Sequence, residues 1–497
     1  MTAKIKHNCG VKESAHTISL KRATSYLLMA TSGILREVDR KPLSVAGRKM
    51  IDFPGVGCIK LLFMKSSLFL LVVLLGAYLK GYCQADEKAG EWPTWFVSSG
   101  KKYTIPPAGG NKQELGEVLK RQSLLDSSAL AQVKYWNAGS PGYRWVNWMN
   151  DLWMSPAAGD IGPVAFMVLQ VAIYDATVIT WKEKYRHKRL RPVASDPGVK
   201  QFGPVPVSPS YPCETSVAAG VAVAIMKKYF PSLADSAMRM AERAMQSRVD
   251  AGLAYPSDTR AGFVLGSLIA ADELDYVKEF PPAVKWNGKR PEGKYIWQGQ
   301  PSFPTAGFSK TVVLKTAHQL RPGPPPDFAR DMEELKAFQP GFQSTANAFY
   351  FATEPVWTDI LKLKLFEHNI HLNPPLAAKI YAATAIGMYD GFVSCWDAKY
   401  TYWGTRPDQY DSSFKPVLFF SPPFPGYPSG HAMIGSVMAE IMAYFFPTDK
   451  DYFRQRAIDG AESRFQGGIH FRTDNEVGLE MGRQLGVEVV QKLSNQH

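Results

Sequence analysis

Apolar residues recur with the spacing of a helix face along much of the chain, and the strict alternation of a half-buried strand is scarce. The helix-period segments are 164–178, 216–228, 233–248, 376–394, 432–446 and 451–463. Residues 276–345 are instead rich in proline, glycine and tryptophan, which excludes long regular elements and favours one short helix at 327–338. The pattern therefore predicts an all-α fold.

Two stretches of the chain, residues 160–275 and 376–491, align with each other. In both, a lysine precedes an Arg-Pro pair by seven residues, and a second arginine follows the proline of a Tyr-Pro pair by 36 residues. The matched residues are Lys184 and Lys399, Arg191 and Arg406, Pro212 and Pro428, Arg248 and Arg464, and Asp258 and Asp474. Because both stretches are helical, we predict two packed helix bundles that arose by internal duplication.

The remaining segments are expected to cover and connect these bundles. Residues 86–159 should wrap them, and residues 276–375 should form an ordered Pro- and Gly-rich connection. The wrapping segment carries Trp92, Trp95, Trp136, Trp145 and Trp148. Such tryptophans can form a carbohydrate platform, but packing against the core is the prediction.

A leader is predicted before the wrapping segment. An apolar run at 68–79 follows two lysines and precedes small residues, which is the order found in a secretory signal peptide. We therefore predict a signal peptide at 64–85, starting at Met64, and a spurious or unstructured extension at 1–63.

Export to the periplasm or the extracellular space follows from this leader. Lipid anchoring at Cys83 is disfavoured because Tyr82 is bulkier than lipobox patterns allow. No apolar run after residue 85 has the length that a bilayer requires, so we expect no transmembrane span in the mature chain.

The formal net charge of +12 does not indicate a nucleic-acid-binding surface. Residues 1–85 hold 13 Lys and Arg against 4 Asp and Glu, so they supply +9 and the remaining chain only +3. After residue 85 the cysteines are Cys213 and Cys395, which are too few for a disulfide framework, although one bridge between them stays open.

The second stretch carries three cations, two histidines and a carboxylate in a fixed order. They are Lys399, Arg406, the run Ser429-Gly430-His431, Arg464, His470 and Asp474. Singly, these would be surface charges, a helix cap and an i,i+4 pair. Together they suit a tetrahedral oxyanion, because lysine and arginine neutralise its oxygens, one histidine can bond its central atom and the other can move protons. Ser429 and Gly430 should also present backbone N–H groups at a helix N-terminus, which favours an anion.

This ordered set resembles the signature shared by vanadium-dependent haloperoxidases and type-2 phosphatidic acid phosphatases. The resemblance implies that five residues hold the equatorial oxygens of vanadate or phosphate: Lys399, Arg406, Ser429, Gly430 and Arg464. It also implies that His470 is the axial ligand of vanadate or the phosphatase nucleophile, that His431 is the acid–base group, and that Asp474 orients the His470 ring.

The first stretch lacks this chemistry. Thr215 stands in place of His431 and Ala254 in place of His470, while Glu214 puts a negative charge at the position of Gly430. We therefore predict that its cations, Lys184, Arg191 and Arg248, form structural ion pairs or lie at the surface.

Details outside the anion signature favour the haloperoxidase branch. Trp396 and Phe424 fall where chloroperoxidase-like members carry aromatic residues on the halide side, although core packing would also account for both. The resemblance thus predicts a vanadate-dependent enzyme that oxidises a halide with hydrogen peroxide to hypohalous acid, with homodimerisation as a family-level expectation. One alternative is a soluble acid phosphatase that cleaves phosphate esters through a phospho-histidine, and another is a non-catalytic oxyanion-binding protein. The halide and the organic substrate stay open.

Overall fold

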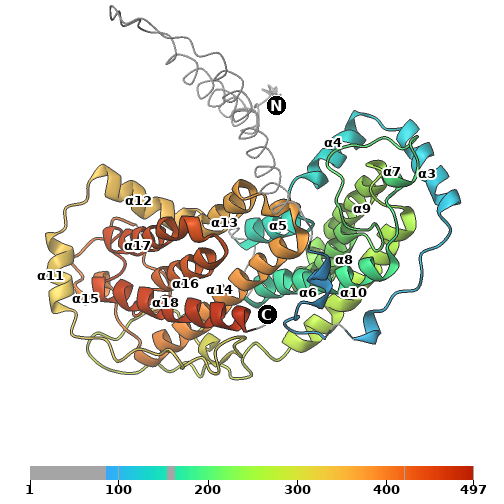
Figure 1. The fold of residues 1–497 in the computed structure, drawn as a ribbon. Helices are drawn as coiled ribbons and strands as arrows, with labels where there is room; N and C mark the ends of the chain where they lie inside the picture. The colour runs from blue at the N-terminus through green and yellow to red at the C-terminus, as the bar shows by residue number, and fades with distance from the viewer. Residues whose placement is uncertain (1–85, 99, 154–162, 419, 496–497) are drawn as a thin grey trace, which may run out of the picture. The chain divides into compact units, whose positions relative to one another are not determined.

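The computed structural model describes residues 86–98, 100–153, 163–418 and 420–495 (Figure 1). The predicted extension at 1–63 and the predicted signal peptide at 64–85 lie outside the described residues. Within the described part of the chain the regular elements are helices, and one isolated β-bridge joins Ile296 to Gly404. The predicted all-α fold is confirmed.

Four helices form the first bundle. They are α6 (Pro163–His187), α8 (Glu214–Tyr229), α9 (Ala234–Asp250) and α10 (Pro256–Val277). α6 is buried along nearly its whole length because its residues are apolar on all sides, which is typical of a central helix. α8 and α10 pack on α6 and on each other, and α9 packs on α8 (Figure 1).

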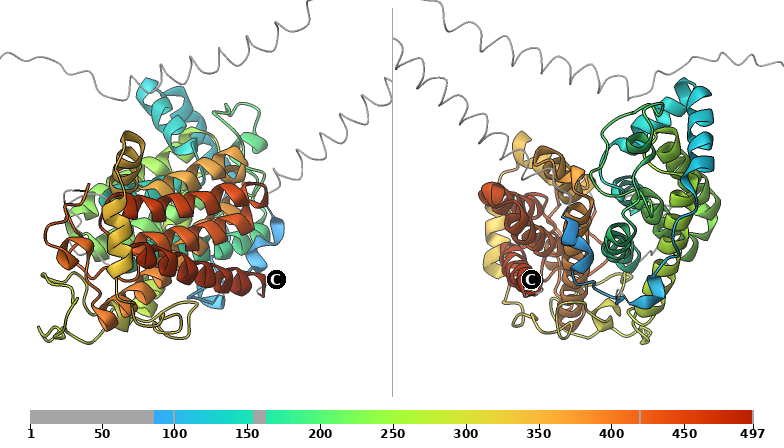
Figure 2. Two further views of the ribbon diagram at one scale, coloured as in Figure 1. Left: turned by 90° about the vertical axis from the view of Figure 1, so that its left-hand side faces the viewer. Right: turned by 45° about the vertical axis from the view of Figure 1, so that its right-hand side comes forward.

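The second bundle repeats this arrangement. It consists of α14 (Pro374–Tyr402), α16 (Gly430–Phe445), α17 (Lys450–Gln466) and α18 (Arg472–Ser494). α14 begins where the Asn373 side chain accepts the N–H of Leu376 and prolines occupy the first turn. α6 and α14 pack against each other and so join the bundles (Figure 2). The predicted pair of packed helix bundles is therefore confirmed.

The last helix of each bundle, α10 and α18, was not among the predicted segments. Both contain several glycines, which weaken a helix prediction made from sequence. The structure explains them by close packing: a Cβ at Gly266 would lie 2.1 Å from the Val217 carbonyl oxygen, and one at Gly482 would lie 2.2 Å from that of Met433. Glycine lets α10 and α18 approach α8 and α16 at backbone distance.

Shorter helices cover and connect the bundles. The α-helices are α3 (Asn111–Ser123), α4 (Ser127–Asn137), α5 (Tyr143–Trp153), α7 (Pro192–Ser195), α11 (Ala329–Ala337), α12 (Phe342–Thr353), α13 (Val356–Glu367) and α15 (Pro407–Tyr410). The 3-10 turns are η1 (Glu87–Glu91), η2 (Lys101–Tyr103), η4 (Pro231–Leu233), η5 (Ala306–Phe308), η6 (Ile370–Leu372) and η7 (Pro447–Asp449). α11 confirms the short helix predicted at 327–338.

The tryptophans before the first bundle pack inward. Trp136 and Trp145 are buried, and Trp92, Trp95 and Trp148 are partly buried against the same apolar core. Core packing, rather than a carbohydrate platform, accounts for these side chains.

The connection between the bundles is ordered and attached to α14. The Asp390 carboxylate accepts the backbone N–H groups of Val312, Val313 and Leu314 at 2.7–3.0 Å. Farther along, Arg321 makes a bidentate pair with Asp397, with both N···O distances at 2.7 Å. These contacts attach the connection to α14.

The structure bears on two further points raised by the sequence. The helical stretch at 163–195 does have the length and hydropathy of a membrane span, but its apolar window is entirely buried inside the protein, as in a core helix. Cys213 and Cys395 are both buried and free, so the bridge left open by the sequence does not form.

Candidate functional site

The structure brings the predicted anion-site residues together in the second bundle. They are Lys399 near the end of α14, Arg406 before α15, Ser429, Gly430 and His431 at the start of α16, Arg464 near the end of α17, and His470 and Asp474 around the start of α18. The three cations all act to lower the pKa of both histidines, as expected for charges in one cluster. Residues on or beside five helices, from α14 to α18, thus contribute to one site.

Lys399 is fully buried and fixes the loop that leads into α16. Its ammonium group donates to the carbonyl oxygens of Pro425, Gly426 and Pro428 at 2.7, 2.7 and 2.6 Å. Burial, with a smaller effect of Arg406, lowers the pKa of Lys399 to about 8. The side chain is therefore mostly charged at neutral pH, and it acts on an anion from a fixed position.

Arg406 is also fully buried and is held at two points. Its Nε donates to the Phe424 carbonyl at 3.0 Å and its Nη1 to the Ile469 carbonyl at 2.7 Å. Its Nη2 is buried and has no hydrogen-bond partner in the described structure. A buried guanidinium donor without a partner is rare and is suited to an anionic ligand.

Arg464 is anchored in the same way. Its Nε donates to Ser463 Oγ at 3.0 Å and its Nη2 to the Ala348 carbonyl at 2.9 Å. Burial, followed by the charge of Arg406, lowers its pKa to about 10. The proximity of two buried arginines is unfavourable unless a negative charge balances them.

His470 and Asp474 form the pair that their spacing predicts. His470 Nδ1 lies 2.9 Å from Asp474 Oδ2, which also accepts the backbone N–H of Phe471 at 3.1 Å. An oxygen that accepts two such bonds assigns the proton of the ring to Nδ1. The His470 Nε2 lone pair then faces the cations, and Arg406 Nη1 is 3.4 Å away.

Burial dominates the titration of this pair. It lowers the pKa of His470 well below 6.5, with the three cations acting in the same direction, and it raises the pKa of Asp474 to about 7 against the opposing effect of Lys399. Taken alone, each pKa shift favours the neutral form of its group, the imidazole of His470 and the carboxylic acid of Asp474. We consider Asp474 to be ionised, because Lys399 and Arg406 both lower its pKa and its carboxylate accepts two N–H groups.

His431 differs from the rest in being exposed. Burial, Arg464, Lys399 and Arg406 lower its pKa to about 3. Solvent reaches the His431 ring although protein surrounds it, so exposure and an effect of burial occur together. The three cations also lower the pKa, which gives the shift its direction independently of burial. His431 is therefore a neutral imidazole that water or a small substrate can reach.

The start of α16 corrects one sequence expectation. The N–H of Ser429 is not available to an anion, because it donates to the backbone oxygen of Asp474 at 2.8 Å. The Ser429 side chain caps the helix by accepting the N–H of Ala432. Among the described residues the N–H of Gly430 has no partner, so the backbone donor expected at this helix start is that of Gly430 alone.

Trp396 and Phe424 lie beside the cations. Their ring centroids are 4.9 Å apart, and Lys399 Nζ is 5.9 Å from the first ring and 5.3 Å from the second. Both rings also belong to an apolar cluster of the second bundle, so core packing and a place at the site are compatible. Their assignment to the halide side stays a prediction.

In the first bundle two of the three matched cations form ion pairs as predicted, and the prediction is wrong for the third, Arg248. Lys184 Nζ lies 2.6 Å from Glu214 Oε2, and Arg191 Nη2 lies 3.0 Å from Glu214 Oε1. Arg248 is different, because it donates to Asn137 and Ser247 rather than to a carboxylate, and it is buried rather than at the surface.

The sequence did not reveal what holds the start of α18. Asp331 in α11 accepts both the backbone N–H and the hydroxyl of Thr473, and Phe328 stacks on Phe471 with centroids 4.3 Å apart. These contacts fix the turn between His470 and its partner. α11 was predicted as a helix, but no spacing in the sequence relates it to this turn.

The arrangement fits a vanadate or phosphate ion on three grounds. Arg406 Nη2 is an unpartnered buried donor. Next, a Cβ at Gly430 would meet Trp396, Cys395 and Lys399 only at 3.5–3.9 Å, so glycine leaves space beside the cations. Finally, the matched cations of the first bundle do hold an anion, the carboxylate of Glu214.

Comparisons with known proteins agree with this fold. Residues 451–497 match a family model described as the VCPO second helical-bundle domain. A bacterial vanadium-dependent iodoperoxidase structure shares 21% identity with a TM-score of 0.52, covering 78% of this chain and 98% of that chain. A bacterial vanadium-dependent chloroperoxidase in its holo form shares 14% identity with a TM-score of 0.53, covering 69% of this chain and 94% of that chain. A search of curated proteins finds no match.

These identities establish the fold. The described part of the chain folds as bacterial vanadium haloperoxidases do, and the match at 451–497 supports the resemblance to the vanadium haloperoxidase superfamily.

Proposed function

We propose that this protein is a vanadate-dependent haloperoxidase that oxidises a halide with hydrogen peroxide. The observation that supports this most strongly is the cluster of Lys399, Arg406 and Arg464, which all lower the pKa of His470, with Arg406 Nη1 3.4 Å from His470 Nε2. The solved structures of like fold are described as vanadium-dependent iodoperoxidase and chloroperoxidase, and they favour peroxidase over phosphatase chemistry.

Each buried residue would have a separate task. Lys399, Arg406, Arg464, the Gly430 N–H and the Ser429 hydroxyl would hold the oxygens of vanadate, and His470 Nε2 would bind the metal. Asp474 would keep the proton on Nδ1 and so keep Nε2 available. When bound, vanadate supplies the centre at which hydrogen peroxide becomes reactive toward a halide.

His431 would move the proton. Its ring is exposed and uncharged in the absence of an anion, because the cations lower its pKa to about 3. An oxyanion between those cations would cancel much of their effect and return the pKa toward 6.5. A ring nitrogen of His431 could then accept a proton from hydrogen peroxide and return it to the leaving oxygen.

We also propose that the two bundles arose by duplication and that the mature chain is exported. Matched contacts support the first point: the N–H of Cys213 donates to the Asp258 carbonyl as that of Ser429 donates to the Asp474 carbonyl. The leader predicted at 64–85 supports the second.

The test is an assay of the purified mature chain with and without orthovanadate. We expect oxidation of iodide, bromide or chloride by hydrogen peroxide only after vanadate is added, and inhibition of this loading by phosphate. Hydrolysis of p-nitrophenyl phosphate without halide oxidation would establish the phosphatase instead. Absence of both activities, with phosphate still bound, would indicate a binding protein.

A further inference from the structure

The first bundle contains a buried carboxylate at the start of α8. Glu214 is 8% exposed, and its two oxygens lie 2.6 Å from Lys184 Nζ and 3.0 Å from Arg191 Nη2. Lys184 is fully buried and Arg191 is 5% exposed. Both cations are also fixed by loop carbonyls, Lys184 by Pro209 and Arg191 by Ser208 and Leu253.

These cations correspond to the oxyanion-site cations of the second bundle. Lys399 and Arg406 are fixed by loop carbonyls in the same way, but they have Gly430 at the position of Glu214. A third cation, Arg248, has a buried Nη2 without a hydrogen-bond partner in the described structure, and Glu214 is among the charges that act on it. The carboxylate of Glu214 therefore occupies the place that an external anion would take.

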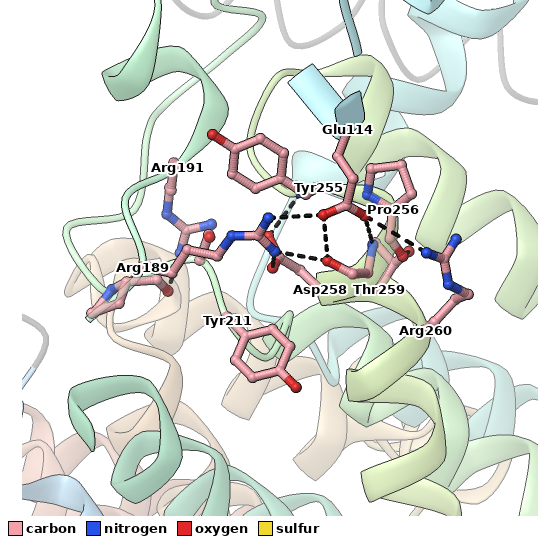
Figure 3. Close-up of polar contacts among 12 residues, drawn as sticks. Glu114, Arg189, Arg191, Tyr211, Tyr255, Pro256, Asp258, Thr259 and Arg260 are labelled. Carbon is pink, nitrogen blue, oxygen red and sulfur yellow. Dashed lines mark hydrogen bonds and ion pairs between the residues drawn. The ribbon is translucent and has the colours of Figure 1, made fainter. Parts of the chain in front are cut away.

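A second difference from the other bundle lies around Asp258, where Figure 3 shows the polar contacts of Arg189. Arg189 pairs with Asp258 and, at 2.8 Å, with Glu114. Asp258 is the counterpart of Asp474. Asp258 bonds an arginine, Arg189, whereas Asp474 bonds a histidine, His470. The position of that histidine is Ala254, which cannot bond the central atom of an oxyanion.

We infer that the first bundle is a closed oxyanion site whose anion is its own Glu214 carboxylate, and that removal of this carboxylate opens the site to inorganic phosphate. Lys184, Arg191 and the free Nη2 of Arg248 supply the donors. Binding there is reversible and without turnover, because the histidines are replaced by Thr215 and Ala254.

The experiment counts bound phosphate by equilibrium dialysis of the mature chain with radiolabelled phosphate. Glu214→Gly should bind one phosphate per chain more than the wild type, and adding Lys184→Gln should remove that extra phosphate. The exposed residue Glu242 on α9 provides the control, because Glu242→Gln should leave the count unchanged. Only the difference from the wild type is read, so the result does not depend on whether the second bundle binds vanadate.

Thermal unfolding keeps the inference testable if Glu214→Gly folds poorly. Loss of the carboxylate leaves buried cations unpaired, so Glu214→Gly and Glu214→Gln should melt below the wild type in chloride buffer. Phosphate at equal ionic strength should raise the Tm of the variants by several degrees more than that of the wild type. No extra phosphate and no phosphate-specific rise in Tm in either variant would overturn the inference, and so would a failure of both to fold in phosphate.

Discussion

A glutamate at position 430 should close the oxyanion site of the second bundle. A Cβ there meets neighbouring side chains only at ordinary contact distances of 3.5 Å or more, so a side chain can start at this position without moving the backbone. Its carboxylate should pair with Lys399 and Arg406, as Glu214 pairs with the matched cations of the first bundle. Gly430→Glu thus adds a tethered competitor for any external anion.

The first bundle gives the magnitude. There the cations lower the pKa of Glu214 from 4.5 to about 2, even though burial acts in the opposite direction. A difference of about 2.5 in pKa corresponds to about 3 kcal/mol in favour of the ionised carboxylate. An external oxyanion must displace that carboxylate, so its affinity should fall roughly 200-fold.

Equilibrium dialysis with vanadate, and separately with phosphate, measures this loss. Gly430→Ala provides the control for the added Cβ and should stay within about tenfold of the wild type. Gly430→Gln provides the control for size, because its amide lacks the charge that holds a carboxylate between the cations, and it should fall between the other two variants.

Stability separates competition from misfolding. The new carboxylate balances buried positive charge, so the anion-free Gly430→Glu protein should melt at or above the wild-type temperature while it loses the ligand. Affinity within tenfold of the wild type, or a lower Tm together with weak binding, would refute the reasoning.

Three further predictions concern single side chains. His470→Ala should abolish vanadate binding, and retained vanadate with full turnover would exclude this residue as the ligand. His431→Gln should keep vanadate in equilibrium dialysis but reduce kcat by about 10²–10⁴, and an unchanged kcat would remove it from proton transfer. Burial raises the pKa of Asp390 from 3.8 to about 6. Between these two values the folded protein keeps a proton on this carboxyl that the unfolded chain has lost, so its contribution to stability falls as pH rises from about 4 to about 6. The difference in unfolding free energy between the wild type and Asp390→Asn should therefore shrink from pH 4 to pH 6.5 in urea titrations, whereas a constant difference would contradict the assignment.

Spacing along the sequence was sufficient for contacts within one element or one turn. The spacing of four positions from His470 to Asp474 places Nδ1 and Oδ2 in contact because a helix begins there. The spacing of seven positions from Lys399 to Arg406 is compatible with a helix end followed by a loop, which is where the structure has them. Helical periodicity likewise gave the central helices of both bundles.

Contacts between distant segments could not be obtained in this way. Which hydrogen bond the Ser429 N–H makes depends on how α16 meets α18, and that packing depends on glycines whose role is visible only in three dimensions. The support of Thr473 by Asp331 joins residues 142 positions apart. The sequence alone did not show that Glu214 is the anion of the first bundle, because a glutamate at this position could either repel an external anion or replace it. The distances from its carboxylate to Lys184 and Arg191 show that it pairs with both.

The most direct test of the account is the position of vanadium in crystals of the wild-type protein grown with orthovanadate. Anomalous diffraction at the vanadium edge should show one vanadium per chain, within bonding distance of His470 Nε2 and among Lys399, Arg406 and Arg464. Vanadium bound elsewhere, or no vanadium at saturating vanadate, would contradict the assignment of this site.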